Sequence, residues 1–523
     1  MHSIVSSARA VLTTFKCGVS VTALCLVSTI GASAQTPGND GNIVVAQAET
    51  GFDGRLGNPG AIDLRGPLDI TDAREFSISP RLGVLESFTD NVLLTPTNQE
   101  HDFVTRFNLD NQLNVNTGRT LIDINSSLSY DKYASHSELD GYSIQGIASG
   151  TYAAIPAFLY LDAEGQVSNG TATTFGTSAL DRSGTNGRVQ LATYNLGPRI
   201  TTTIGDIAEL LVRGRFAQVN YDTEDAAASP LLPTNSTIYQ ANAVATTGER
   251  FLGFQFDTAG SYQRDDHGYR AYNGTESVFF RVLPSLRLLA RGGYEHVELP
   301  PTTAIDSPIW STGFEYAPNE DSRITLEGGE RYNRTNWRAE ALFRLGARLT
   351  WTASYRQVLQ PSQVSINDAA TGFMDFNRLI SAPGLTLSSP QFGNLVDQPS
   401  LSKTAETRLL YQMERDTLNF ALVYDDRRFV GTGDRDSSIQ AQVNYTRRLA
   451  EDLDLNFGGA YGKTFTSTIF GESEMIRAEI GVAYQLNSTW NARVGYAISH
   501  NSHSSLSGSV LENVAFVALQ KSL

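Results

Sequence analysis

Charged side chains recur at alternate positions in several short segments of this 523-residue chain. Glu406, for example, is followed two residues later by Arg408. In an extended chain such residues point to the same face. If that face lines water, mixed rings of charge set the selectivity of a pore for ions or sugars. The candidate pore-lining residues are Arg213, Arg215, Arg287, Arg291, Arg338, Glu340, Arg344, Glu406, Arg408, Arg477 and Glu479. The alternative is that neighbouring Arg and Glu neutralise one another and fill the interior.

Aspartate clusters and histidines offer two other kinds of chemistry. Pairs such as Asp265-Asp266 and Asp425-Asp426 stand in polar segments, where calcium would use several carboxylate oxygens. None matches an EF-hand loop, and the seven histidines lack the spacing of metal ligands. We therefore expect a solvated acidic surface, no metal site and no cofactor.

A hydrolytic site would need a nucleophile, a base and an orienting partner. His101 beside Asp102, and His267 beside Asp265 and Asp266, are the only candidates that we identify. A His next to an Asp in a polar segment is usually part of a turn. We expect no enzyme, and a hydrolase active at the rim of a barrel is the third choice of function.

The segments that must position these residues have a period of two. In Met475 to Tyr484, apolar side chains such as Ile476 and Ile480 alternate with Arg477 and Glu479. The same split recurs around Trp337 to Arg344 and Ile439 to Thr446. Alternation indicates half-buried strands, and it also fits a soluble sheet with one wet face.

The connections between these segments favour a membrane barrel. Tight turns, such as Asn116-Thr117-Gly118-Arg119 and Gly205-Asp206, alternate in order with mostly longer polar loops, the longest being residues 361–402. Barrels of the outer membrane have short periplasmic turns and longer outward loops. We predict an all-β fold, a transmembrane antiparallel up-and-down β-barrel over residues 75–523, with about 22 strands and a range of about 18 to 24.

The first 74 residues differ from the rest. Arg9 and Lys16, an apolar stretch from Cys17 to Ile30 and Ala32-Ser33-Ala34 indicate a signal peptide over residues 1–34, cleaved after Ala34. Residues 35–74 are rich in Gly, Asp, Asn and Pro, and we expect a flexible periplasmic arm. The net charge of −15 disfavours nucleic-acid partners.

Two stretches resemble a known family. Leu85-Glu86-Ser87-Phe88-Thr89-Asp90-Asn91-Val92-Leu93-Leu94-Thr95-Pro96, followed by Asp102-Phe103-Val104-Thr105, resembles the opening of exosortase (PEP-CTERM) system-associated outer-membrane proteins, which are related to the β-barrel porin 2 families. Phe314-Glu315-Tyr316-Ala317-Pro318-Asn319-Glu320-Asp321-Ser322-Arg323-Ile324-Thr325 is similar to a second stretch of that group. The resemblance implies an outer-membrane barrel without enzymatic activity, often encoded with exopolysaccharide or surface-export systems.

We therefore expect a porin-like channel or surface-export component of the cell outer membrane, with a link to exopolysaccharide. A structural or adhesive surface barrel with a closed lumen is the alternative. The expected partners are outer-membrane lipid and lipopolysaccharide, the barrel-assembly machinery, and polysaccharide or small solutes. We also hypothesise that the long loop over residues 361–402 folds inward and narrows the pore, because long structureless loops are usually functional or disordered.

Overall fold

A computed structural model describes residues 75–171, 179–180, 188–222, 234–248, 251, 253–300, 303–319, 322–346, 348–367, 398–467, 471–503 and 508–523. The chain divides into two units, Met1–Val44 and Val45–Leu523, and every described residue belongs to the second. The expected signal peptide and the expected arm lie outside the described residues. Among the described residues, no helix has the length and apolar character to cross a membrane.

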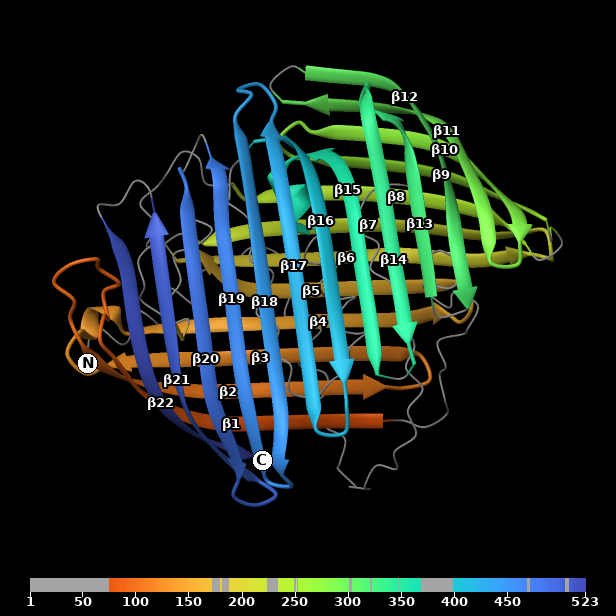
Figure 1. Ribbon diagram of the computed structural model, residues 1–523. Helices are drawn as coiled ribbons and strands as arrows, with labels where there is room; N and C mark the ends of the chain where they lie inside the picture. The colour runs from red at the N-terminus through yellow and green to blue at the C-terminus, as the bar shows by residue number, and fades with distance from the viewer. Residues whose placement is uncertain are drawn as a thin grey trace. The chain divides into compact units, whose positions relative to one another are not determined.

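Twenty-two strands form one sheet, in which each strand is antiparallel to its neighbour in the chain (Figure 1). A short 3-10 helix, η2 (Ser137–Leu139), lies between β3 and β4, and residues 362–367 are helical. The strands are β1 (Glu75–Thr89), β2 (Asp102–Asn116), β3 (Thr120–Tyr133), β4 (Gly141–Ile155), β5 (Leu159–Thr171), β6 (Arg188–Ile204), β7 (Ala208–Asp222), β8 (Ser236–Thr247), β9 (Phe254–Asp265), β10 (Arg270–Leu283), β11 (Leu286–Leu299), β12 (Thr303–Asn319), β13 (Ser322–Arg331), β14 (Arg334–Leu345), β15 (Leu349–Gln360), β16 (Ser400–Gln412), β17 (Asp416–Phe429), β18 (Arg435–Ala450), β19 (Leu453–Ser467), β20 (Ser473–Gln485), β21 (Trp490–His503) and β22 (Ser509–Ser522).

The sheet closes on itself because β1 also pairs with β22. This seam is antiparallel and runs from Arg81 opposite Ser522 to Thr89 opposite Val514. Closure leaves the sheet without an unpaired edge, so each strand has a backbone partner on both sides. The predicted fold, an all-β closed antiparallel barrel of 22 strands, is confirmed.

Side chains at the end of the seam strengthen the closure. The carboxylate of Asp90 accepts hydrogen bonds from the backbone N–H and the side-chain amide of Asn513, both at 2.7 Å. The side-chain amide of Asn91 donates to the carbonyl of Leu511 at 2.9 Å and to that of Thr95 at 2.8 Å. The Asp90-Asn91 pair of the first family-like stretch therefore ties the first hairpin loop to the last strand.

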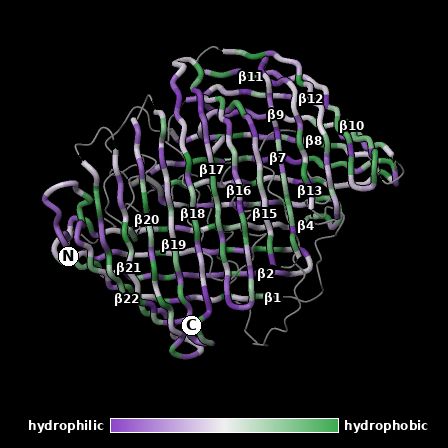
Figure 2. Tube along the Cα trace, viewed as in Figure 1, coloured by the Kyte–Doolittle hydropathy of each residue, from purple (hydrophilic) through white to green (hydrophobic). Residues whose placement is uncertain are grey.

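The two faces of the wall have opposite chemistry. In β11 the side chains of Leu288 and Tyr294 are 48% and 50% exposed, whereas Arg291 and Glu295, at the intervening parity, are 9% and 1% exposed. Figure 2 shows hydropathy alternating along the strands in this way. In soluble proteins charged residues are almost never fully buried and large apolar side chains are usually inside. Here the apolar side chains point outward, as they do in barrels that contact lipid.

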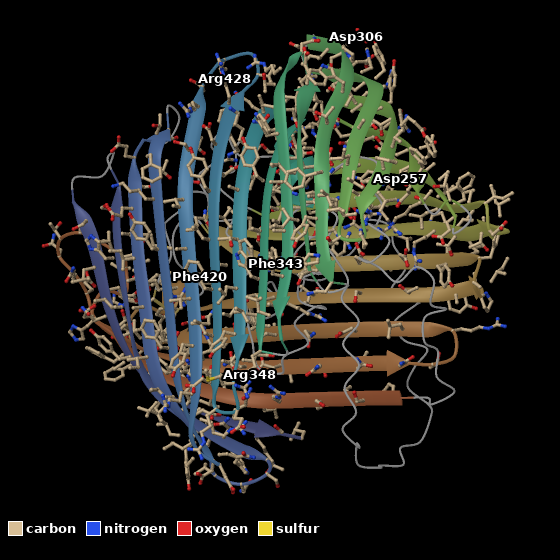
Figure 3. All side chains as sticks on the ribbon, turned by 45° about the vertical axis from the view of Figure 1, so that its right-hand side comes forward. Asp257, Asp306, Phe343, Arg348, Phe420 and Arg428 are labelled. Atoms are coloured by element: carbon tan, nitrogen blue, oxygen red, sulfur yellow. The ribbon has the colours of Figure 1, made fainter. Side chains whose placement is uncertain are left out.

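The strands are long enough to cross a bilayer. A transmembrane strand needs about 9 to 11 residues, and the strands here run from 10 residues in β13 to 17 in β6 and β12. In Figure 3 Phe343 and Phe420 lie partway along the wall, whereas Arg348 and Arg428 lie near its opposite ends. Side chains thus extend along the whole length of the wall.

The two ends of the barrel differ in their connections. At one end the connections are tight turns, such as residues 117–119 between β2 and β3 and residues 205–207 between β6 and β7. At the other end they are mostly longer, as expected, but residues 300–302 and 332–333 are short. Tyr332 and Asn333 both have positive φ, 58° and 56°, which is typical of a two-residue type I′ hairpin turn. The connection between β13 and β14 is therefore only two residues long, Tyr332 and Asn333.

An apolar cluster lies on the inner face near the end with the longer loops. Val364 and Ile366, from the helical residues 362–367, pack there against side chains from the ends of several strands. The buried members of this inner apolar cluster are Val189, Leu191, Ala217, Val219, Ile238, Tyr269, Val297, Leu299, Tyr332, Leu359, Val364 and Ile366. The hypothesis of an inward loop therefore has support for residues 361–367, while residues 368–397 lie outside the described residues.

Candidate functional site

Inward charged residues of β5, β6 and β7 form one cluster. Arg199 lies directly opposite Arg213 across β6 and β7, and each contacts Asp162, Arg199 at 2.8 Å and Arg213 at 3.8 Å. Glu164 lies 3.5 Å from Arg213 and 3.7 Å from Arg215. The like charges of the three arginines are therefore held together by two carboxylates that alternate along β5.

A second group of ion pairs follows along β9 to β13. The guanidinium of Arg287 donates to Glu315 at 2.9 Å and to the side-chain oxygen of Gln255 at 2.9 Å. Arg291 contacts Glu327 at 3.5 Å and donates to Ser277 at 3.1 Å. Both carboxylates are nearly inaccessible, since Glu315 is 1% exposed and Glu327 2%. Buried charges of this kind need a partner to offset desolvation.

Glu295 lies at the centre of a third network, beside the inner apolar cluster. Its carboxylate accepts hydrogen bonds from Arg331 at 2.8 Å, from the hydroxyl of Ser307 at 2.9 Å and from the backbone N–H of Tyr332 at 2.8 Å. The guanidinium of Arg331 also lies over the Tyr332 ring, 4.7 Å from its centroid. These contacts hold the two-residue turn inward. Glu295, Arg331 and Tyr332 also line a pocket, together with Gln263, Tyr269 and Gln360.

The remaining predicted residues lie on β14, β16 and β20. Arg338 pairs with Glu340 at 2.6 Å, and Arg408 pairs with Glu406. Glu479 pairs with Arg493 rather than with Arg477. Arg344 donates its backbone N–H to the hydroxyl of Ser322 at 3.3 Å. Of these arginines, Arg477 makes no ion pair within the described part of the chain.

Sequence reasoning missed several members of these networks. Arg199, Asp162, Glu295, Glu315 and Arg331 all face inward. Asp162 and Glu315 contact the predicted residues Arg213 and Arg287, whereas Glu295 and Arg331 pair with each other. Their inward orientation could have been predicted from the sequence, because each lies an even number of positions from another inward residue of its strand. The partner of each charge could not be predicted from the sequence, because most of these pairs join residues more than 20 positions apart.

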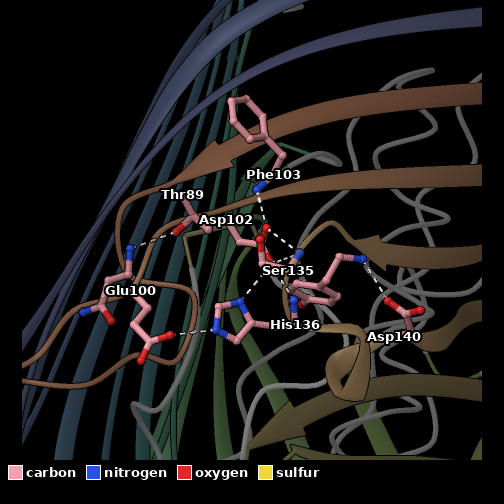
Figure 4. A network of polar contacts seen from close by, with 9 residues as sticks. Thr89, Glu100, Asp102, Phe103, Ser135, His136 and Asp140 are labelled. Atoms are coloured by element: carbon pink, nitrogen blue, oxygen red, sulfur yellow. Dashed lines mark hydrogen bonds and ion pairs between the residues drawn. The ribbon is translucent and has the colours of Figure 1, made fainter.

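A separate polar network lies at the loop end, between the β1–β2 and β3–β4 connections (Figure 4). The carboxylate of Asp102 accepts hydrogen bonds from the backbone N–H groups of Phe103, Ser135 and His136. The imidazole of His136 lies 3.0 Å from Asp102 through Nδ1 and 2.9 Å from Glu100 through Nε2. Hydrogen bonds to Asp102 and then to Glu100 raise the pKa of His136 above its usual value.

The histidines that could have served catalysis have other surroundings. His101 lies beside Asp102 in the chain, but its ring lies against Phe88, with 6.0 Å between centroids, and Asp102 binds His136 instead. His267 contacts Asp266 at 2.9 Å and the hydroxyl of Thr234 at 2.9 Å. Asp265 accepts the backbone N–H groups of His267 and Tyr269, as in a turn. The described residues contain no group of three or more His, Cys, Asp or Glu placed to hold a metal ion.

Comparisons with known proteins concern the fold alone. No family model and no curated protein matches the sequence, so the family expected from the two stretches is not shown. A mutant of the ferric enterobactin receptor PfeA from Pseudomonas aeruginosa is similar in structure, with 11% identity, a TM-score of 0.42, and coverage of 86% of this chain and 80% of that one. The copper transporter OprC has 9% identity, a TM-score of 0.44, and coverage of 86% and 83%. Pseudomonas aeruginosa OprD has 9% identity, a TM-score of 0.32, and coverage of 87% and 98%.

Proposed function

We propose that this chain is a channel or transporter of the outer membrane. The observation that carries the proposal is the inverted wall: a closed barrel with apolar side chains outside and ion-paired, hydrogen-bonding side chains inside. An apolar outer surface of this kind is suited to contact with lipid, whereas a soluble sheet would present polar side chains to water on that face. A barrel of about 22 strands encloses a wide lumen, and its polar lining is compatible with water.

The candidate pore-lining residues are part of this proposal. Arg213, Arg215, Arg287, Arg291, Arg338 and Arg408 each have a carboxylate partner, so most of the positive charge of this set is offset by a neighbouring carboxylate. Balanced charge favours weak ion selectivity. The inward residues 361–367 would narrow the passage on the side of β6 to β15, where they pack against the inner apolar cluster.

Two measurements test the proposal. Protein purified in detergent should migrate faster on SDS gels before boiling than after, because a closed barrel resists SDS at room temperature. In planar bilayers with KCl it should produce discrete conductance steps. Extraction into buffer without detergent would contradict the membrane setting, and a silent bilayer containing folded barrel would contradict an open channel.

The second candidate is a structural or adhesive surface barrel with a closed lumen. The inner apolar cluster favours it, because Val364 and Ile366 are 0% and 5% exposed against the inner wall. Conductance separates the two functions, since a folded, SDS-resistant barrel that never conducts supports the closed form. The link to exopolysaccharide export rests on the family resemblance. Deletion of the gene followed by measurement of surface polysaccharide tests that link directly.

A further inference from the structure

Basic side chains gather on the outer face of β16, β17 and β18, near the end with the longer loops. Arg428 of β17 lies directly opposite Arg435 of β18, and both side chains are exposed. Lys403 of β16 lies opposite Asp426, which is two residues from Arg428 on β17 and therefore on the same face. Figure 3 shows Arg428 at this end of the wall. We call Lys403, Arg428 and Arg435 the outer basic cluster.

The residues at the intervening positions point into the barrel. Arg427 pairs with Asp436 at 2.6 Å, and Asp436 is only 3% exposed. Tyr424, four residues before Arg428, is 37% exposed on the other face. Successive residues of a strand point to opposite faces. The outer basic cluster is therefore on the same side of the wall as the exposed apolar side chains.

The carboxylates of this hairpin do not neutralise the cluster. Asp426 accepts two hydrogen bonds from Arg435, at 2.7 and 3.1 Å. Asp434 is in the turn between β17 and β18, and even with it the cations outnumber the carboxylates. The side chains of Lys403 and Arg428 make no ion pair within the described part of the chain. Like charges directly opposite each other on neighbouring strands are destabilising, so an anion bound beside the two arginines would relieve their repulsion.

Along the outer face of β17 the chemistry changes in the same order as along a lipid molecule. Tyr424 follows Arg428 toward the middle of the wall, and Leu422 and Phe420 come next. Phe420 lies partway along the wall in Figure 3. Tyrosine favours the boundary between headgroups and hydrocarbon, whereas leucine and phenylalanine favour the hydrocarbon itself. Arg428 is therefore at the level expected of the lipid headgroups.

The hairpin of β9 and β10 has a similar arrangement. Arg264 lies directly opposite Arg270 as the last outward pair before the turn, and the next outward pair is Tyr262 opposite Tyr272. Arg270 contacts Glu298 at 3.6 Å, whereas Arg264 makes no ion pair within the residues that the structure describes. Opposed arginines thus end the outer face of two separate hairpins, as expected of contacts with a continuous layer of anionic headgroups.

We infer that the outer basic cluster binds the phosphate groups of lipopolysaccharide, the glycolipid of the outer leaflet. The longer loops of an outer-membrane barrel face the cell exterior, so the cluster lies in that leaflet. Guanidinium groups donate paired hydrogen bonds to phosphate oxygens, and a lysine ammonium adds a compact charge. The acyl chains would lie along Leu422 and Phe420. This inference rests on the membrane setting of the proposed function and adds a lipid partner to it.

The experiment uses the full-length barrel in detergent, with EDTA present to remove bridging divalent cations, and measures lipid binding by native mass spectrometry. The probes are bisphosphorylated lipid A, the same lipid without its phosphates, and inorganic phosphate as a competitor. The test variant combines Lys403→Gln with Arg428→Gln and keeps Arg435 with its carboxylate partner. The control combines Arg348→Gln with Arg415→Gln, which removes the same charge from exposed positions in the turns at the opposite end.

We expect the wild type and the control to bind bisphosphorylated lipid A with equal affinity. The test variant should bind it at least about tenfold more weakly, which corresponds to about 1.4 kcal/mol, because two contacts with the phosphates are lost. Lipid A without phosphates should bind weakly to all three proteins.

Three results would overturn the inference: equal binding by the test variant and the control in their SDS-resistant forms, equal binding of the two lipids, or displacement of lipid A by inorganic phosphate. The channel is tested separately by the KCl current. Current without lipid A binding would contradict the lipid site but not the channel, whereas lipid A binding without current would contradict the channel but not the lipid site.

Discussion

Thr89 and Glu512, which are 423 residues apart in the chain, are joined by a hydrogen bond of 2.9 Å inside the barrel wall. Both side chains are 0% exposed. The same carboxylate also accepts the backbone N–H of Ala179 at 2.7 Å and the hydroxyl of Ser499 at 3.4 Å. One side chain of the last strand thus connects the first strand, a loop segment and the neighbouring strand at the seam.

Replacing this carboxylate should weaken the closed barrel. Glu512→Ala leaves the hydroxyl of Thr89 and the N–H of Ala179 buried without their acceptor, and each unsatisfied group costs about 1 to 3 kcal/mol. We expect the temperature at which the compact SDS-gel band disappears to fall clearly. Glu138→Ala, in the exposed helix η2, is the matched control and should leave that temperature unchanged. Equal behaviour of the two variants would contradict the role of the seam.

Breaking one buried ion pair should destabilise the barrel and alter ion preference together. Glu327→Gln leaves Arg291 without its carboxylate, and removing one partner of a buried pair costs about 3 to 5 kcal/mol. The lumen gains net positive charge, so the reversal potential in a KCl gradient should move toward that of chloride. Urea unfolding and reversal potentials measure the two effects.

The double variant provides the control for that pair. Arg291→Gln combined with Glu327→Gln removes both charges, and the reversal potential should return close to the wild-type value. Stability should also recover in part, because no uncompensated charge remains. If the single and double variants share one reversal potential, the pair does not line the conducting path.

The inward segment should control the size of the passage. Val364→Ala combined with Ile366→Ala removes buried methyl groups from the inner apolar cluster, and an Ile→Ala change in a core typically costs about 2 to 5 kcal/mol. The segment should then dock less firmly, and single-channel conductance should rise or fluctuate more. Val84→Ala combined with Ile78→Ala, on the exposed outer face of β1, is the control. Unchanged conductance in the first variant would show that residues 361–367 do not narrow the passage.

The loop network should respond to pH through His136. Hydrogen bonds to Asp102 and Glu100 raise the pKa of His136 above its usual 6.5. A raised pKa in the folded state means that the contribution to stability is full below the ordinary value and is lost as the pH rises through the folded value. Hydrogen exchange of residues 134–140 should therefore be slower at pH 6 than at pH 8.5, beyond the intrinsic change in exchange rate.

Two substitutions test the origin of that pH dependence. His136→Gln cannot carry the charge, so the extra protection at low pH should disappear. His101→Gln is the control, because His101 makes no ion pair within the described residues. Identical pH dependence in the wild type and His136→Gln would assign the effect to another group.

Much of the fold followed from the sequence because the two relevant signals are local. Alternation in segments such as Met475 to Tyr484 placed Ile480 outside and Glu479 inside, and short turns such as residues 205–207 marked where each hairpin reverses. In an up-and-down barrel each strand pairs mainly with its neighbour in the chain. Local periodicity and turn chemistry therefore specify most of the topology.

The partners of the inner charges did not follow in the same way. Parity assigned Arg287 to the inner face, but only the register of β11 with β12 places it opposite Glu315. His136 was missed because Asp102 reaches it across 34 residues through the meeting of two loops.

The pairing of β1 with β22 also has a kinetic consequence. Twenty-one hairpins can form as soon as two successive strands exist, but the seam must wait for the last of the 22 strands to be synthesised. Contacts between residues so far apart carry a large loop-closure entropy and slow folding. Until then the open sheet would have two edge strands, whose unpaired backbone N–H and C=O groups can pair with another chain. The chain should therefore depend on chaperones that cover the edge of β1 until β22 pairs with it.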